Sequence, residues 1–496
     1  MTYRSTRGAD AGTSFSEAVI KGLASDGGLF VPEEEVLFTP AEIKDMCGMD
    51  YKSIAALVMS RYADDFTEGE INECVDGAYT DAKFPGGPAA VTTLDKDLSV
   101  LELWHGPTCA FKDMALQILP RYMKKAVEKR GESKEITILT ATSGDTGKAA
   151  LEGFKDVPGV KIMVFYPSEG VSETQKLQMV TQAGNNVNVV AIEGNFDNCQ
   201  TGVKKIFSDK AFEEKLLRDG KMLSSANSIN FGRLLPQIVY YFFSYAVLVS
   251  RGTVKFGDII DFCVPTGNFG DILACYYAKK AGLPVGKIIC ASNENNVVAD
   301  FLNTGVYDKN RDFVTTTSPA MDILVSSNLE RLLYDALGKD CSAVRGLMDR
   351  LSRFGVYRVP SEALKFIQKD FAAGCSVRAE VSEEIGRIYN KYNYLIDPHT
   401  AVGVSVYGKC SDKARHTVCV STASPFKFNA CVAESLFANE IPEGTGEDCI
   451  SALLSEKTGI AIPAPLRGLF EKEIRFKDKV KPEMMPEKSE DFIYDR

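Results

Sequence analysis

IIDFCVPTGNFGDILACY, residues 259–276, joins a short apolar run to a helical pattern through a glycine-rich loop. The run Ile259–Val264 is rich in β-branched residues, which favour a buried strand. In the loop, Gly267 and Gly270 let the backbone approach an anion closely, and the N–H groups at the start of a helix attract phosphate. Strand, loop and helix in this order are typical of parallel α/β layers. A glycine turn is also a common structural solution, so the loop alone identifies no ligand.

The same alternation begins at about residue 96, where short apolar runs bounded by Gly, Pro, Ser or Asn alternate with amphipathic segments. Strands are expected at 136–140, 160–166, 187–192, 259–264, 287–291 and 417–420. Helices are expected at 114–129, with a kink at Pro120, and at 146–154, 173–182, 199–207, 234–249 and 272–280. The fold class is therefore predicted as α/β, with two parallel-sheet units.

The length of 496 residues allows about three domains. We expect a mostly helical N-terminal domain over 1–95 and two α/β units over 96–252 and 253–496. Within the last unit, residues 300–390 show helical character, many charges and no clear strand, which favours a helical insertion. Residues 472–496 are expected to form a charged, partly mobile tail.

The charge balance excludes several classes of function. The chain has 57 Lys and Arg against 67 Asp and Glu, a formal charge of −10, which argues against a general nucleic-acid binder. Only three histidines occur, so chemistry built on several imidazoles is nearly excluded. No Gly-x-Ser-x-Gly elbow of a serine hydrolase is present. His399 follows Asp397-Pro398, and a structural turn that caps the next helix is the favoured interpretation.

The thirteen cysteines are spread singly, with no Cys-x-x-Cys pair, and predict neither a disulfide framework nor a metal site. They are typical of a reducing compartment, and residues 1–8 lack the apolar run of a secretory signal, so a cytoplasmic location is expected. The most apolar stretch, 234–249, falls short of the roughly 20 residues needed to span a bilayer. It predicts a buried helix and no membrane partner.

Two further loops follow predicted strands. Residues 142–147, Thr-Ser-Gly-Asp-Thr-Gly, resemble a phosphate-binding loop near Gly147-Lys148, but Thr142 and Ala149 stand where a P-loop needs Gly and Ser or Thr. ATP is therefore disfavoured, and an ordinary helix-capping turn stays open as an alternative. Residues 421–425, Ser-Thr-Ala-Ser-Pro, place hydroxyl groups at the carboxyl end of a strand, where α/β proteins bind ligands.

Lys112 lies in Leu103–Met114 beside Ala110 and Phe111. A lysine among apolar neighbours loses hydration, which lowers its pKa and makes it a nucleophile or imine former. The alternative for any single lysine is a surface side chain whose stem covers apolar area.

Taken together, these motifs resemble the threonine synthase family of pyridoxal-phosphate enzymes, which have the tryptophan-synthase-like fold (fold type II). The resemblance runs in the family's order from the N-terminus to about residue 430. The matching stretches are 22–32 (GLASDGGLFVP), 105–108 (HGPT), 111–113 (FKD), 142–147, 227–230 (NSIN), 267–271, 397–401 (DPHTA) and 421–423 (STA).

The resemblance implies conversion of O-phospho-L-homoserine and water to L-threonine and phosphate, with pyridoxal 5'-phosphate as cofactor. It places the cofactor lysine and the substrate loop in 96–252, and the loop for the cofactor phosphate in 253–496. Lys112 would hold the cofactor and move the substrate protons. The implied cofactor-binding residues are Lys112, Gly267, Asn268, Phe269, Gly270, Asp271 and Thr422, the last at the pyridine nitrogen. The implied substrate-binding residues are Ser143, Gly144, Asp145, Thr146, Asn227, Ser228 and Arg233.

The family branch also suggests a monomer. Ser424 and Phe426 stand where many members carry His and Ala, and Met114 stands where Arg is frequent in the wider fold class. Two alternatives stay open. A phospho-lyase would use the same lysine and loops and release phosphate, ammonia and a 2-oxo acid. A non-catalytic binding protein of this fold would be expected to lose Lys112, which this chain retains.

Overall fold

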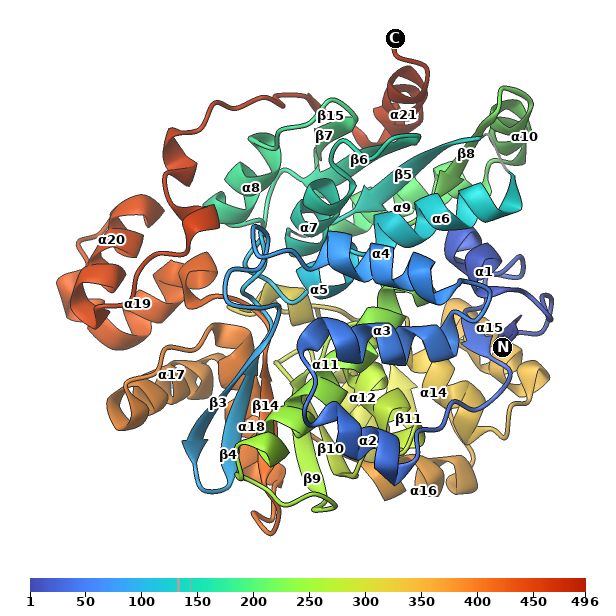
Figure 1. The fold of residues 1–496 in the computed structure, drawn as a ribbon. Coiled ribbons are helices and arrows are strands. Elements are labelled where there is room, and N and C mark those ends of the chain that lie inside the picture. The colour runs from blue at the N-terminus through green and yellow to red at the C-terminus, as the bar shows by residue number, and fades with distance from the viewer. Residues whose placement is uncertain (132–133, 143) are drawn as a thin grey trace.

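Two sheets organise the chain in the computed structural model, which describes residues 1–131, 134–142 and 144–496. The six-stranded sheet has the order β13-β10-β9-β14-β4-β3 and is parallel except for the β3–β4 pair. Its strands are β3 (Ala90–Asp95), β4 (Leu98–Glu102), β9 (Ile260–Pro265), β10 (Val285–Ser292), β13 (Phe371–Cys375) and β14 (Thr417–Ser421). Figure 1 shows it in the lower part of the molecule.

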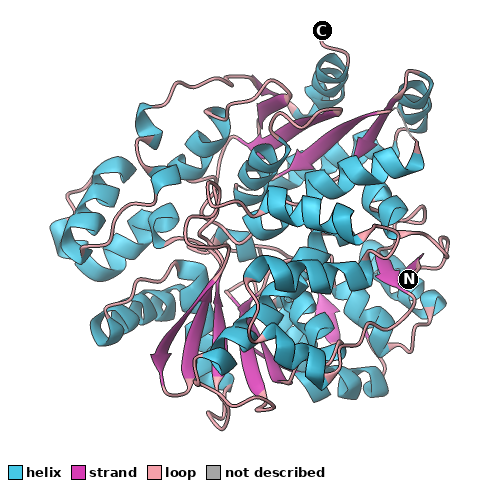
Figure 2. Cartoon of the chain, in the orientation of Figure 1, coloured by secondary structure: helices cyan, strands magenta, loops and turns pink. Residues whose placement is uncertain are grey.

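The five-stranded sheet is parallel throughout, with the order β15-β7-β6-β5-β8. Its strands are β5 (Glu135–Ala141), β6 (Val160–Pro167), β7 (Val187–Ile192), β8 (Lys221–Ser224) and β15 (Lys479–Val480). Two small antiparallel pairs complete the strands, β1 (Tyr3–Ser5) with β2 (Phe30–Pro32) and β11 (Val306–Asp308) with β12 (Val356–Arg358). Figure 2 shows the two main groups of strands with helices packed around them.

Helices cover both sheets, and most of them belong to the α/β alternation. The N-terminal helices are α1 (Phe15–Lys21), α2 (Pro40–Met46), α3 (Tyr51–Tyr62) and α4 (Glu68–Ala78). The central helices are α5 (Asp113–Leu116), α6 (Leu119–Arg130), α7 (Asp145–Phe154), α8 (Glu173–Val180), α9 (Phe196–Ser208), α10 (Lys210–Arg218), α11 (Phe231–Ser250) and α12 (Gly270–Lys280). The later helices are α13 (Val297–Thr304), α14 (Leu329–Ala336), α15 (Cys341–Phe354), α16 (Ser361–Asp370), α17 (Arg378–Tyr392), α18 (Pro398–Cys410), α19 (Asn429–Phe437), α20 (Glu447–Thr458) and α21 (Met485–Ile493).

Helix α11 lies at the centre of the packing. It is buried along most of its length and contacts α3, α5 and α12, so it joins the N-terminal helices to the six-stranded sheet. Tyr241 of α11 meets Phe262 of β9 edge to face, and Phe231 at the helix start meets Tyr3 of β1 in the same way. The prediction of a buried helix here is confirmed. Among the described residues, none of the helices has the length and apolar character to cross a bilayer.

The predicted strands are confirmed within two residues at each end and the predicted helices within three, apart from the helix at 114–129. That segment is divided, because α5 ends at Leu116 and α6 begins at Leu119. Pro120 sits in the first turn of α6, where its missing N–H costs nothing, so it marks a helix start and not a kink.

Two expectations about organisation need correction, and a third is not tested. The 300–390 region is not free of strands, since it contains β11, β12 and β13, and β13 is an edge of the six-stranded sheet. Residues 479–493 are not a free tail, since β15 pairs with β7 and α21 packs on α9; in Figure 1 this red segment runs from α20 to the five-stranded sheet. The partition at 95/96 and 252/253 stays a prediction; β4 pairs with β14 and β3 pairs with β4, so both strands belong to the sheet that also holds the strands of the last unit.

Candidate active site

The segment before Lys112 runs beside the end of β14. The amide of Leu103 donates to the carbonyl of Ser421 at 3.1 Å, and the amide of Phe111 donates to the carbonyl of Thr422 at 2.8 Å. Because β4 and β14 are neighbouring parallel strands, their carboxyl ends open at one edge of the sheet. Lys112 is therefore held next to Thr422 at the edge where α/β proteins bind ligands.

Lys112 is buried, with 8% of its surface exposed. Its Nζ lies 3.4 Å from Oδ2 of Asp145 and 4.8 Å from the centre of the Phe111 ring. Burial lowers the pKa of Lys112; Asp145 opposes this effect, and the charges of Lys427 and Arg233 add to it. The desolvation expected from the apolar neighbours is therefore present, while the catalytic role of this lysine stays a prediction.

Asp145, the first residue of α7, faces two lysines. Its Oδ1 forms an ion pair with Lys427 Nζ at 2.8 Å and accepts a hydrogen bond from Gln175 Nε2 at 2.7 Å. Burial alone would raise the pKa of Asp145, but the charges of Lys427 and Lys112 outweigh it and hold the pKa well below its ordinary value. Lys427 is completely buried, and the sequence interpretation did not assign it to the site. Its flanking phenylalanines, Phe426 and Phe428, carry the same signal that marked Lys112.

The loop before α7 is held by one hydroxyl. Thr142 Oγ1 accepts from the amides of Gly144 and Gly147, at 2.9 Å each. Gly144 has a φ of 142°, and a Cβ there would come within 2.6 Å of the Gln175 side chain, so only glycine fits. Thr146 is half-buried in the first turn of α7, whose N-terminus attracts anions. Ser143, predicted to bind substrate, lies outside the described residues.

The loop 267–271 turns sharply into α12. A Cβ at Gly267 would come within 2.7 Å of the Ala320 carbonyl, and Phe269 has a φ of 61°. Asn268 is exposed, and its carbonyl accepts from the amide of Asn328 at 3.1 Å and from Asn328 Nδ2 at 2.9 Å. This pairing fixes the loop while α12 presents its N-terminal amides beside Gly270.

Asp271 follows in the first turn of α12. Its Oδ1 accepts from the hydroxyls of Tyr240 and Tyr241, whereas Oδ2 is buried and has no partner among the described residues. Burial raises the pKa of Asp271 to about 6, against the opposing effect of both tyrosines and of the Lys112 charge. Asp271 therefore lies within electrostatic range of Lys112.

Arg233 supplies a buried cation in the first turn of α11. It is 5% exposed, and its Nη1 donates to the Ala226 carbonyl at 3.0 Å. Its Nε is buried without a hydrogen-bond partner in the part of the chain that the structure describes, and burial lowers the pKa of Arg233 to about 10. Asn227 and Ser228 are half-buried on the preceding loop, and a Cβ at Gly270 would lie 3.9 Å from Ser228 Cβ. The predicted substrate-phosphate loop thus borders the start of α12.

Thr422 is 6% exposed and follows β14 directly. Beyond it lie Ser424 and Phe426, the two positions where many members of the resembling family carry His and Ala. Ser424 Oγ accepts from the amide of Phe426 and caps the short helix Pro425–Phe428. Met114 is fully buried, and its carbonyl accepts from Tyr79 at 2.6 Å.

His399 has a structural position. Asp397 accepts from the amides of His399 and Thr400 and so caps α18, as predicted. The imidazole Nδ1 lies 2.6 Å from Asp397 Oδ2, and Nε2 accepts from the Ala320 amide at 3.2 Å. The ring therefore joins α18 to the segment that covers Gly267.

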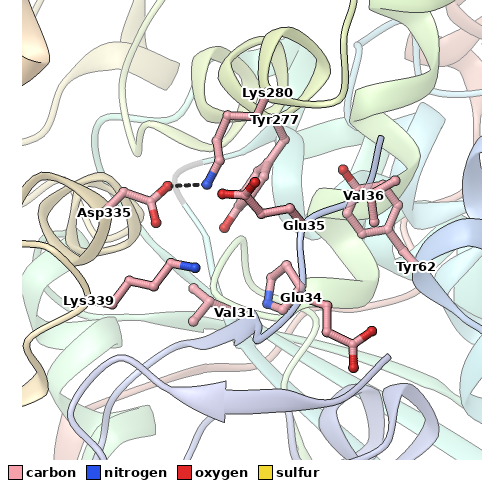
Figure 3. Close-up of a pocket in the computed structure, with 10 residues that line it drawn as sticks. Val31, Glu34, Glu35, Val36, Tyr62, Tyr277, Lys280, Asp335 and Lys339 are labelled. Atoms are coloured by element: carbon pink, nitrogen blue, oxygen red, sulfur yellow. Dashed lines mark hydrogen bonds and ion pairs between the residues drawn. The ribbon is translucent and has the colours of Figure 1, made fainter. Parts of the chain in front are cut away.

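The cavity in Figure 3 lies away from these residues, at the C-terminal end of α12. Its volume of about 20 Å³ is room for roughly one water molecule. Lys280 and Asp335, which line it, form an ion pair at 2.7 Å. No group of three or more His, Cys, Asp or Glu side chains could hold a metal ion in the described part of the chain. The candidate site is thus defined by its side-chain cluster, not by a cavity.

Comparisons with known proteins cover almost the whole chain. The family model described as Threonine synthase N terminus matches residues 2–79, Pyridoxal-phosphate dependent enzyme matches 90–422, and Threonine synthase, C-terminal matches 400–493. The threonine synthase of Pseudomonas aeruginosa is 39% identical over 485 residues, 96% of this chain and 95% of that protein. The Homo sapiens protein called Threonine synthase-like 1 is 41% identical over 439 residues, 86% of this chain. The match covers only 59% of that human protein's length.

A solved structure gives the same result. The crystal structure of PLP-bound threonine synthase from Brucella melitensis has a TM-score of 0.87 and 36% identity, and the match covers 99% of each chain.

Proposed function

This chain belongs to the threonine synthase family of pyridoxal-phosphate-dependent enzymes, and from that premise we propose that it converts O-phospho-L-homoserine and water to L-threonine and phosphate. One observation carries the proposal furthest: two buried cations lie in one site, the amine of Lys112 and the guanidinium of Arg233, whose charge helps to lower the pKa of Lys112 and which forms no ion pair with a carboxylate among the described residues. An amine for the cofactor and a cation for a phosphate are the two groups that this reaction needs.

The residues present fit pyridoxal phosphate. Its aldehyde requires an amine, which Lys112 offers in a desolvated position. Its phosphate requires converging donors, which the turn 267–271 and the start of α12 offer, where Gly267 leaves no room for a side chain. Its ring nitrogen requires a polar partner, which the Thr422 hydroxyl would provide as a neutral group. When bound, the cofactor supplies an electron sink for carbanions formed next to the amino group.

The chain's own groups would then divide the work. Lys112 Nζ takes the proton from Cα of the substrate and returns a proton at the end of the reaction. Arg233, with Asn227 and Ser228, holds the substrate phosphate until the Cγ–O bond breaks, and water adds at Cβ. A guanidinium suits this task because its planar donors match two phosphate oxygens.

The substrate carboxylate is assigned to the backbone of 144–146 and the hydroxyl of Thr146, at the N-terminus of α7. The Asp145 side chain takes a different part, because its oxygens are already paired with Lys112, Lys427 and Gln175. A second carboxylate would be repelled from that side chain. Asp145 therefore contributes its backbone to the substrate and its side chain to the lysines.

The test is product analysis with the purified chain. O-phospho-L-homoserine is added, and threonine, inorganic phosphate and 2-oxobutyrate are measured together with the visible absorbance of the bound cofactor. Threonine and phosphate in equal amounts support the proposal. 2-Oxobutyrate as the main product would instead identify a phospho-lyase. Lys112→Ala is expected to remove both the visible absorbance and the activity, whereas Lys409→Ala, an exposed lysine on α18, is expected to keep both.

We propose further that the protein is a monomer of the cytoplasm. The family branch suggests the first point, and the absence of any disulfide among the described residues is compatible with the second. An elution volume that corresponds to twice the mass of 54.3 kDa would contradict the monomer.

A further inference from the structure

Two lysines share a single carboxylate in the site. Asp145 forms ion pairs with both Lys112 and Lys427, and in the described chain no other carboxylate lies within ion-pair distance of either amine. These groups come from three separate segments, the start of α5, the start of α7 and the short helix Pro425–Phe428. All three side chains are buried.

The sharing is unequal. Lys427 Nζ lies 2.8 Å from Asp145 Oδ1 and also donates to the Thr108 carbonyl at 3.0 Å. Lys112 Nζ lies 3.4 Å from Oδ2, and Asp145 is its one hydrogen-bond partner among the described residues. Lys427 is therefore the well-satisfied cation of the two, and it neutralises most of the charge that Asp145 could offer to Lys112.

Burial makes an excess charge costly, since a buried ion without full compensation gives up or takes up a proton instead. Because Asp145 is already paired with Lys427, the excess positive charge is removed at the lowest cost in free energy when Lys112 loses its proton. Two more distant charged groups belong to the surroundings: the charge of Arg233 from α11 adds to the lowering of the Lys112 pKa, and the charge of Lys112 opposes the raised pKa of Asp271 from α12. The charge of Lys427 also acts on the buried carboxyl of Asp113, where it opposes the rise in pKa that burial causes.

We propose that Lys427 is a positioning residue that occupies Asp145 and thereby keeps Lys112 a neutral amine, ready to capture the cofactor. The inference rests on the proposed role of Lys112. In the capture step the lone pair of Nζ forms a bond to the aldehyde carbon, and the aldehyde oxygen leaves as water with the two protons of the amine. Only the neutral amine has that lone pair. The lowered pKa of Lys112 agrees with this assignment.

The test measures cofactor capture by the full chain after its cofactor has been removed. Pyridoxal 5'-phosphate is added at a series of pH values, and the rate of appearance of the visible absorbance gives the midpoint of Lys112 ionisation. Lys427→Gln keeps a polar side chain but removes the charge, so Asp145 then pairs with Lys112 alone and holds its proton. The midpoint is expected to rise by at least about one pH unit, which slows capture roughly tenfold below the midpoint.

Three further variants separate this effect from a loss of folding. Lys427→Arg keeps the charge and is expected to restore the midpoint. Asp145→Asn combined with Lys427→Gln removes the anion as well, so the midpoint is expected to fall back to the wild-type value or below it. Lys148→Gln removes a half-buried lysine of α7, which pairs with Glu152 at 3.2 Å, and is expected to leave the midpoint unchanged.

A midpoint for Lys427→Gln equal to that of wild type would overturn the inference, as would an equal rise in the variant that also lacks Asp145. If Lys427→Gln does not fold, Lys427→Met, which fills the same buried volume without a charge, takes its place, and a midpoint equal to that of wild type overturns the inference in the same way. A visible absorbance that survives Lys112→Ala would contradict the proposed function itself, which is a separate outcome.

Discussion

Arg331 Nη2 donates to the carbonyl of Ile229 at 2.7 Å, directly behind the loop assigned to the substrate phosphate. Its Nε donates to the carbonyl of Phe30 at 2.9 Å, and its Nη1 donates to Asn328, whose own amide group holds the Asn268 carbonyl. One fully buried arginine thus joins the N-terminal strand β2 to both phosphate loops. This contact gives the N-terminal region a direct part in shaping the site.

Arg331→Met should therefore destabilise the fold and loosen both loops. It leaves the carbonyls of Phe30 and Ile229 without donors, and each loss costs about 1–3 kcal/mol, so the free energy of unfolding should fall by about 2–6 kcal/mol. Urea denaturation measures this, and the apparent affinity for pyridoxal phosphate should fall in parallel. Arg350→Met, at an exposed position of α15, is the matched control and should change little. Equal free energies of unfolding for Arg331→Met and Arg350→Met would show that the contacts of Arg331 do not stabilise the fold.

Arg233→Met should weaken the binding of the substrate phosphate. Among the residues that the structure describes, the buried guanidinium has no carboxylate partner, so the substrate phosphate is expected to supply the negative charge that balances it. Loss of a charge-assisted contact worth about 1.5–3 kcal/mol should raise KM for O-phospho-L-homoserine about 10- to 100-fold, and Arg233→Lys should recover only part of it. Inorganic phosphate at 100 times its Kd should stabilise the wild-type chain by about 2.7 kcal/mol. A similar stabilisation of Arg233→Met would place the phosphate elsewhere.

Asp271 should make stability depend on pH once the cofactor is removed. Its pKa is raised from 3.8 to about 6 by burial, so its contribution to folding is complete below 3.8 and is lost as the pH rises through about 6. Asp271→Asn keeps an acceptor for both tyrosine hydroxyls and cannot ionise. Relative to wild type, it should therefore gain about 2 kcal/mol of unfolding free energy between pH 4.5 and pH 7.5. A difference that is constant over this range would show that the Asp271 carboxyl does not titrate there.

The strands that the sequence predicted share one property, a run of β-branched residues long enough to be visible. β13 lacks that signal because Phe371–Cys375 contains no β-branched residue, so its membership of the sheet depends on pairing with β10 alone. β4 was passed over for a related reason, since its place beside β14 is decided by a partner more than 300 residues away. Local patterns reveal which segments can be strands, but not which sheet they join.

The candidate site, too, could be predicted from the sequence only in part. Lys112 and the glycine loops were recognisable because their neighbours in sequence create the burial and the turns. Lys427 has comparable neighbours in Phe426 and Phe428, yet its importance comes from Asp145, 282 positions earlier in the printed sequence. Arg331 had no local signal at all, since two of its three acceptors lie 301 and 102 positions away. Pairwise contacts of this range arise only in the folded chain.

Met485→Ala should destabilise the protein strongly, because the C-terminal segment is part of the core. Met485 is fully buried in the cluster that includes Leu139 and Phe165 of the five-stranded sheet, and its sulfur lies against Gly202 of α9. Truncation should lower the free energy of unfolding by about 2–5 kcal/mol. Met484→Ala removes the same side chain one position earlier, where it is 38% exposed, and should cost less than about 0.5 kcal/mol. Urea denaturation compares the two, and equal midpoints would mean that residues 479–493 detach in solution and that the five-stranded sheet is stable without β15.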